Sequence, residues 1–201
     1  ANGEDGINEY ILKHLELDSG VVLEIGAWDG FFDSNCANLW SNGSYNGILI
    51  EATSKLNIAD LESRYDNINC YRELISSTNT LEDVIDKCKF DVDENNFVLA
   101  SIDVDGDDLN VARSLGKYKP IILIVEPNGD VITRSNSNGS TIKELIDFGV
   151  DFGYDFMGMS GHVGRHSGNV YLIRNDYKDK FDICSKPWQQ RGIILSEGVL
   201  Y

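Results

Sequence analysis

The sequence feature that most constrains the fold is the stretch VVLEIGAWDG, residues 21–30. Its apolar half is typical of a buried parallel strand, and its two glycines flank a short polar turn. We expect Gly26 to let a ligand approach the backbone, because it has no Cβ, and Gly30 to adopt a backbone angle that bulkier residues resist. Asp33 and Ser34 are good helix N-caps ahead of a further apolar run. The pattern predicts a strand, a glycine turn and a helix, which is half of a nucleotide-binding βαβ unit.

A second predicted strand, residues 47–51, ends in the carboxylate of Glu51. It lies about 20 residues past the glycine turn, where a dinucleotide- or nucleoside-binding fold places an acid for the ribose hydroxyls. The two strand ends would form an adenosine pocket for either NAD or S-adenosylmethionine. The turn lacks the third glycine of the NAD fingerprint. The carboxylates of Glu24 and Asp29 would repel a pyrophosphate but attract a sulfonium and an ammonium group, so the charge pattern favours S-adenosylmethionine.

β-prone apolar segments alternate with amphipathic helical segments along the chain. The expected strands are residues 21–25, 47–51, 67–71, 97–103, 121–126, 154–159 and 169–173, and the expected helices fall in residues 7–17, 34–40, 53–65, 80–88, 107–115 and 140–148. This alternation predicts an α/β fold, a Rossmann-like, doubly wound, mostly parallel seven-stranded sheet with helices on both faces. A length of 201 residues predicts one domain over residues 1–201, and the start at Ala1 rather than Met leaves open that it was excised from a longer chain.

The charge of the chain limits its partners. The formal net charge is −16, whereas proteins that bind nucleic acids or anionic membranes need a basic surface. No apolar run reaches the roughly 20 residues that cross a bilayer. Four cysteines without a CxxC pair are typical of reduced thiols. We therefore expect a cytoplasmic protein that acts on a small molecule and binds neither nucleic acid nor membrane, with its oligomeric state left open.

Several short motifs resemble one enzyme family. LEIGAWDG at residues 23–30, DSN at 33–35 and GILIEA at 47–52 resemble the cofactor motifs of class I S-adenosylmethionine-dependent methyltransferases. SIDVDGDD at 101–108 and IVEPN at 124–128 resemble the fourth and fifth strands of the FkbM-like branch of that family. Many members of this branch methylate oxygens on sugars and natural products, so the resemblance implies O-methylation.

The resemblance also implies roles for the residues at the first strand ends. The turn after the first strand would hold the methionine part of the cofactor, Glu51 the ribose and Ala52 the adenine, with Glu73 or Leu74 at the adenine edge. On this basis the cofactor-binding residues are Glu24, Gly26, Ala27, Trp28, Asp29, Gly30, Glu51, Ala52, Glu73, Leu74 and Asp103.

Acidic residues crowd the end of the fourth predicted strand, at Asp103, Asp105, Asp107 and Asp108, and Glu126 ends the fifth. Strand ends on one edge of a parallel sheet line the ligand crevice, so these side chains should meet there. Asp107 and Asp108 could instead cap the following helix. Asp103 and Asp105 could hold the acceptor hydroxyl, one of them as general base. Asp103, Asp105 and Glu126 could also bind a divalent cation, and we leave these roles open.

A glycine-rich loop, residues 160–168, follows a late strand and contains two histidines and an arginine. At the carboxyl edge of the sheet such a loop could close over the acceptor. His162 or His166 could act as the general base, with His162 preferred. Arg165 could bind an anionic acceptor such as a sugar phosphate or a nucleotide-linked sugar. Glu126 and Asn128 would add polar groups on the acceptor side.

The combined pattern predicts an S-adenosylmethionine-dependent O-methyltransferase that methylates a hydroxyl of a small, sugar-derived acceptor. Methyl transfer requires that the acceptor be aligned with an already activated methyl group and that one proton be removed. Two alternatives stay open: an NAD-dependent oxidoreductase or epimerase on the same sheet, and a non-catalytic domain of a larger polypeptide. Whether a divalent metal is needed also stays open.

Overall fold

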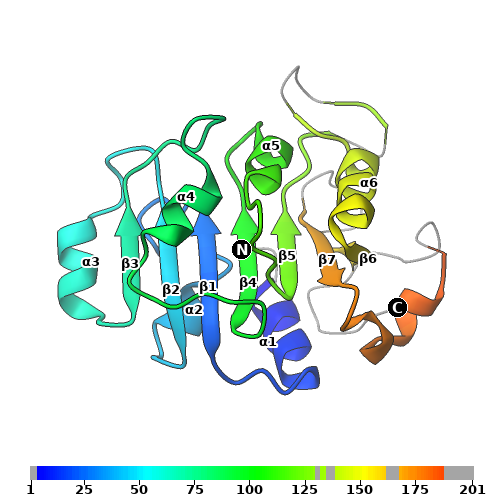
Figure 1. Ribbon diagram of the computed structural model, residues 1–201, viewed down its shortest axis with the longest axis horizontal. Coiled ribbons are helices and arrows are strands. Elements are labelled where there is room, and N and C mark those ends of the chain that lie inside the picture. The colour runs from blue at the N-terminus through cyan, green and yellow to red at the C-terminus, as the bar shows by residue number, and fades with distance from the viewer. Residues whose placement is uncertain (1–3, 130–131, 135–138, 162–167, 188–201) are drawn as a thin grey trace.

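The computed structural model of the chain describes residues 4–129, 132–134, 139–161 and 168–187 (Figure 1). Its centre is a seven-stranded sheet in the order β3-β2-β1-β4-β5-β7-β6. The strands are β1 (Gly20–Ile25), β2 (Tyr45–Ile50), β3 (Ile68–Tyr71), β4 (Phe97–Ile102), β5 (Ile122–Val125), β6 (Tyr154–Met159) and β7 (Val170–Arg174).

Most neighbouring strands of this sheet are parallel. β1 pairs in parallel with β2 and β4, β2 with β3, and β4 with β5. β7 is antiparallel to both β5 and β6, so β6 runs in the same direction as β5. The predicted seven-stranded, mostly parallel sheet is confirmed. The carboxyl ends of every strand except β7 therefore lie along one edge.

Helices cover both faces of the sheet, as predicted. The helices are α1 (Glu4–His14), α2 (Ala37–Trp40), α3 (Ile58–Arg64), α4 (Leu81–Asp86), α5 (Asp108–Arg113) and α6 (Ile142–Phe152), followed by the 3-10 helices η1 (Lys178–Lys180) and η2 (Asp182–Ser185). α1, α2 and α3 pack in one apolar cluster, and α4, α5 and α6 in the other. Val22 and Leu23 of β1 enter opposite clusters, because successive side chains of a strand point to opposite faces.

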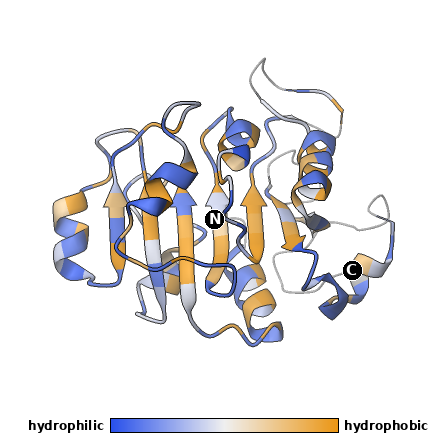
Figure 2. Ribbon diagram, viewed as in Figure 1, coloured by the Kyte–Doolittle hydropathy of each residue, from blue (hydrophilic) through white to orange (hydrophobic). Residues whose placement is uncertain are grey.

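The distribution of apolar residues follows from this layering. Figure 2 shows strands that are apolar along most of their length and helices that carry both apolar and polar residues. A strand covered on both faces needs a nearly continuous apolar run, whereas a surface helix needs one apolar stripe. Among the described residues, no helix combines the length and apolarity that a membrane crossing requires.

Three helix starts differ from the prediction. The helix expected from residue 7 begins at Glu4. The helix expected from residue 53 begins at Ile58, with Asn57 as its N-cap. The chain does not turn helical at Thr53 because the backbone N–H of this residue donates to the Glu51 carboxylate at 2.7 Å. The helix expected after Ser34 is only the single turn of α2, although the Ser34 hydroxyl accepts the N–H of the first helical residue.

Two other predicted helix starts are confirmed as capping boxes. Thr80 and Asp83 form one at α4, and Thr141 and Glu144 form one at α6. In each box the threonine hydroxyl accepts the backbone N–H of the acid, and the acid accepts the N–H of the threonine. Both donors would otherwise lack a partner at a helix start, which is why this polar pattern locates the boundary so well.

Gly26 has a packing role besides the one expected. A Cβ at this position would lie 1.7 Å from the backbone carbonyl oxygen of Asp103, and the residue has a φ of +78°. The glycine therefore lets the chain after β1 pass against the chain after β4. At Gly30 the expected positive φ is present, at +92°. The cavity edge thus depends on close packing between two adjacent strand ends.

Gly26→Ala should destabilise the fold much more than Gly43→Ala. Gly43 has a similar φ of +84°, but a Cβ there meets nothing within 4 Å, so its alanine variant should lose only about 1 kcal/mol of unfolding free energy. Gly26→Ala adds a backbone clash and should lose at least about 3 kcal/mol. Urea unfolding of both variants measures the difference. Equal losses would contradict the packing role of Gly26.

Candidate functional site

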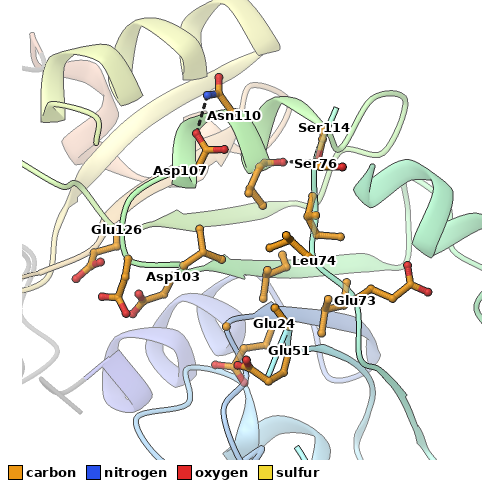
Figure 3. A pocket seen from close by; sticks show the side chains of 18 of the residues that line it. Glu24, Glu51, Glu73, Leu74, Ser76, Asp103, Asp107, Asn110, Ser114 and Glu126 are labelled. Atoms are coloured by element: carbon orange, nitrogen blue, oxygen red, sulfur yellow. Dashed lines mark hydrogen bonds between the residues drawn. The ribbon is translucent and has the colours of Figure 1, made fainter. Parts of the chain in front are cut away.

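A cavity of about 1150 Å³ opens at the carboxyl edge of the sheet. Its walls come from the segments that follow β1, β2, β3, β4 and β5, with one face of α5. Figure 3 shows Glu24 and Glu51 on the wall formed by β1 and β2, and Asp103 and Glu126 on the wall formed by β4 and β5. The parallel topology therefore brings together acids that are distant in the sequence.

Glu51 is fixed by two backbone groups at the end of β2. Its carboxylate is only 6% exposed and accepts the N–H of Trp28 at 2.9 Å and the N–H of Thr53 at 2.7 Å. A carboxylate has about four lone-pair sites, so the two oxygens still have capacity for further donors from the cavity. The first contact also ties the turn after β1 to the end of β2. The predicted ribose acid is thus already oriented by the fold.

Glu24 lies in β1 and lines the cavity, although it is only 4% exposed. The Ser34 hydroxyl donates to one of its oxygens, and the backbone N–H of Asn35 donates to the other at 2.6 Å. Burial raises the pKa of Glu24 to about 7, against the lowering effect of these hydrogen bonds. This carboxylate therefore holds the loop before α2 and is available to a cationic ligand.

The turn between Trp28 and Asp33 has an unusual backbone. Trp28 and Asp33 have positive φ values of 49° and 52°, and one Asp29 oxygen accepts the N–H groups of Phe31 at 2.9 Å and of Phe32 at 2.7 Å. Trp28 and Phe32 line the cavity, and they remain 45% and 65% exposed. Asp29 thus stabilises the turn rather than lining the cavity, and the turn presents two aromatic side chains.

Asp103, Asp105 and Glu126 form a compact acidic group on the opposite wall. One carboxylate oxygen from each lies within 4.8 Å of the others. Burial raises the pKa of Asp103, and the charges of Asp105 and Asp33 raise it further. Burial, the charges of nearby aspartates and a hydrogen bond to Asp103 raise the pKa of Glu126 to about 8. Each of these two carboxyl groups therefore holds a proton more strongly than it would alone.

Asp108 does not cap α5, contrary to one of the expected roles. It is buried, and its carboxylate accepts the N–H groups of Val104 at 2.7 Å and Gly106 at 3.0 Å, and the amide of Asn128 at 2.8 Å. Burial raises its pKa to about 6. Asp107 stands at the N-cap position but makes no side-chain cap hydrogen bond. Asp108 instead folds the acidic loop after β4, because a buried carboxylate requires several donors.

The structure brings most of the predicted site residues together. The predicted residues that line the cavity are Glu24, Gly26, Trp28, Glu51, Ala52, Glu73, Leu74, Asp103, Asp105 and Glu126. The side chain of Asn128, expected on the acceptor side, binds Asp108 instead, and Ala27, Asp29 and Gly30 belong to the turn without lining the cavity. His162, Arg165 and His166 lie outside the described residues, so their roles stay predictions.

The base of the loop that contains these three residues is described. The Ser160 hydroxyl donates to the buried carboxylate of Glu4 at 2.7 Å, and Asn169 donates to Glu4 and to Ser160. The loop leaves β6 at the carboxyl edge, as the direction of that strand requires. The start of α1 therefore holds both ends of the loop near the edge that opens into the cavity.

Sequence reasoning missed the wall formed around α5. Residues there that line the cavity are Ser76, Ser77, Thr80, Asn110, Val111, Arg113 and Ser114. Apart from the buried Val111, these are polar side chains of α5, of its C-terminal end and of the segment before α4. Such side chains are ordinary at a surface, so no sequence signal separates them from solvated ones. Phe32, Asp33 and Asn35 were missed as well, although they directly follow the glycine turn.

Comparison with known proteins tests the fold. No family model and no curated protein matches the sequence. The structure of methyltransferase FkbM from Methylobacillus flagellatus matches 78% of this chain and 44% of its own, with a TM-score of 0.53 and 15% identity. Magnesium protoporphyrin IX methyltransferase from Synechocystis, with bound S-adenosylmethionine, matches 85% and 77%, with a TM-score of 0.55 and 11% identity. Aeropyrum pernix fibrillarin, also with natively bound S-adenosylmethionine, matches 83% and 76%, with a TM-score of 0.52 and 12% identity.

The chain has the class I S-adenosylmethionine-dependent methyltransferase fold. The predicted fold resemblance is thereby confirmed, and it includes a structure of the FkbM type. The chain spans less than half of that structure, 44% of its length. Because the identities are this low, the likeness concerns the architecture, and the chemistry of the cavity has to be argued from its own residues.

The free energy of unfolding should fall as the pH rises from about 4.5 to about 8, and Glu126→Gln should make this decline shallower. The folded-state pKa of Glu126 is raised from its ordinary value of 4.5 to about 8. Between these values the folded state holds a proton that the unfolded state has lost, so rising pH favours unfolding. Urea unfolding at several pH values measures the slope. Glu9→Gln, an exposed change on α1, is the charge-matched control, and equal slopes in the wild type and Glu126→Gln would contradict the shift.

Proposed function

We propose that the protein is an S-adenosylmethionine-dependent methyltransferase that methylates a hydroxyl oxygen of a small acceptor. The observation that carries this proposal is the pair of fixed carboxylates, Glu24 and Glu51, at the ends of β1 and β2 on one cavity. In a doubly wound sheet a ligand binds outside the carboxyl ends of the strands. The two acids suit the ammonium and the ribose hydroxyls of this donor.

The charge of the cavity favours this donor over NAD. Among the described residues that line it, Arg113 is the single arginine or lysine, whereas Glu24, Glu51, Asp103, and other acids face the same space. A pyrophosphate would meet carboxylates at the place where a dinucleotide fold supplies donors. A ligand that carries a sulfonium and an ammonium group is instead attracted there. The second alternative, a non-catalytic domain, does not account for a large cavity with oriented acids.

When bound, S-adenosylmethionine would supply a methyl group on a positively charged sulfur. The acceptor oxygen would form the new C–O bond while the C–S bond breaks and its bonding pair goes to sulfur. The chain's own task is to position the acceptor and take its proton. The Asp103 carboxylate would accept this proton, because burial and neighbouring charges raise its pKa and make it a stronger base. Asp105 adds a negative charge next to it.

Two further features are part of the proposal. The spacing of Asp103, Asp105 and Glu126, with oxygens within 4.8 Å of one another, fits a hard divalent cation that would hold the acceptor oxygen. His162 or His166 would supply a second base from the loop after β6. A sugar-derived acceptor is what the motif resemblance supports.

Glu51→Gln should weaken binding of S-adenosylhomocysteine by about 10- to 100-fold, because a charged acceptor for two hydroxyl groups is lost. Asp29→Asn is the matched control, since Asp29 also accepts two backbone N–H groups but does not line the cavity. Isothermal titration calorimetry of the wild type and both variants measures the affinities. No binding by the wild type would refute the donor assignment, and equal weakening by both changes would reduce Glu51 to a structural role.

Asp103→Asn and His162→Ala should each reduce turnover by about 100-fold or more, with affinity for S-adenosylhomocysteine nearly unchanged, because each removes a group that accepts or relays the acceptor proton. Transfer of labelled methyl from S-adenosylmethionine to a panel of hydroxyl compounds measures turnover. Repeating the assay with a chelator and with added manganese tests the cation. Normal turnover in both variants would contradict the assignment of the acceptor side.

A further inference from the structure

The cavity extends beyond the two acids, Glu24 and Glu51, that are assigned to the methyl donor. Beyond Glu24 and Glu51, the turn after β1 contributes Trp28 and Phe32, and Asp33 next to them is close enough to raise the pKa of Asp103 electrostatically. This places the aromatic turn on the side of the cavity that carries the acidic group. The two features together describe one surface with an apolar half and an anionic half.

The apolar half consists of the side chains of Trp28 and Phe32, and packing within the fold does not explain why they are exposed. Phe31 packs against Trp40 and Tyr65, with ring centroids at 5.1 Å and 6.3 Å. Phe32, the next residue, is 65% exposed and lines the cavity, and Trp28 does so at 45%. Large exposed apolar side chains that border a cavity are typical of a binding surface. A flat ring is the ligand group that matches two aromatic side chains.

The anionic half favours a positive partner. Its acids are Asp33, Asp103, Asp105 and Glu126, and the charges of Asp33 and Asp105 raise the pKa of Asp103. Carboxylates this close together repel one another, and a cation between them relieves that repulsion. In the described walls the single basic residue is Arg113, the last residue of α5. A cation already rests on the aromatic half, because the Lys55 ammonium lies 4.8 Å from the centre of the Trp28 ring.

Building on the methyltransferase assignment, we propose that the acceptor is a ring-bearing amine. Its ring packs against Trp28 and Phe32, and its ammonium group faces Asp33 and Asp105, in place of a divalent cation and beside the Asp103–Glu126 pair that takes the hydroxyl proton. Charge complementarity discriminates between acceptor classes here, because an anionic surface raises the affinity for cationic acceptors and lowers it for anionic ones. The described walls therefore disfavour the phosphorylated acceptor that Arg165 suggested from the sequence, and the aromatic pair favours a flat ring over the sugar-derived acceptor that the motif resemblance suggested.

The test uses three phenols of the same size that differ in charge: tyramine (cationic), tyrosol (neutral) and 4-hydroxyphenylacetate (anionic). Each is titrated calorimetrically into wild-type protein saturated with S-adenosylhomocysteine. Tyramine should bind at least about tenfold more tightly than tyrosol, and 4-hydroxyphenylacetate should bind most weakly. Equal affinities, tightest binding of the anion, or no binding of any probe would overturn the proposal.

Two pairs of variants separate the halves of the surface. Asp105→Asn should reduce the preference for tyramine over tyrosol about threefold or more, and asparagine tolerates the positive φ of 57° at this position. Glu9→Gln removes the same charge from a residue outside the cavity lining and should leave the preference unchanged. Phe32→Leu should weaken tyramine and tyrosol alike, whereas Phe31→Leu should weaken neither, because Phe31 does not line the cavity.

The results also separate this proposal from the one on which it rests. Failure of the wild type to bind S-adenosylhomocysteine refutes the methyltransferase assignment before any acceptor is added. Binding of S-adenosylhomocysteine without a preference for the cationic phenol leaves that assignment intact and refutes the amine acceptor. A preference that persists unchanged in Asp105→Asn and in Phe32→Leu would likewise refute the surface described here.

Discussion

The backbone N–H groups that hold the buried carboxylates are the interaction on which the site depends. Glu51 accepts two of them, from the turn after β1 and from its own turn, Glu24 accepts one from the loop before α2, and Asp108 accepts two from the loop after β4. Each carboxylate costs free energy to remove from water, and these donors offset much of that cost. The loops consequently fold around the acids. Among the described residues of the cavity wall, no cation neutralises these acids, so the backbone donors stabilise them. The same contacts therefore stabilise the edge of the sheet and preorganise the site.

Sequence reasoning located the acids at the strand ends because a simple physical rule applies to them. An apolar run that stops at a carboxylate, as at Glu51 and Glu126, places the acid at the carboxyl edge of a parallel sheet, whatever the details of the loops. Parallel order then follows from the alternation of strands and helices. The same rule also explains why Asp103 was correctly placed on the cavity. These predictions needed only the direction of each strand and no knowledge of side-chain partners.

What the sequence left undetermined depends on contacts between distant segments. Asp107 and Asp108 are adjacent and equally good caps, but the neighbouring loop buries Asp108, and Asn128 from the next strand end supplies its third donor. A glycine is required at position 26 because a Cβ there would clash with the backbone carbonyl of Asp103, which follows another strand. The α5 residues that line the cavity have the same side chains as ordinary surface residues. Only the rotation of α5 about its axis determines which of them face the cavity. In each case the deciding partner is far away in the sequence, so local propensity carries no information about it.

The turn after β1 connects the two halves of the proposed reaction. In this turn Trp28 donates a backbone N–H to Glu51, and the side chains of Trp28 and Phe32 line the same cavity as Asp103. The positive φ values of Trp28 and Asp33 are unfavourable for such residues, and the two hydrogen bonds to Asp29 offset that strain. α1 adds a second connection, because Asn8 donates to the carbonyl of Asn35 beside Glu24 and Glu4 holds the base of the loop after β6. The residues proposed to hold the donor and the acceptor are therefore positioned by shared backbone segments, so a change in one segment should alter both halves of the cavity.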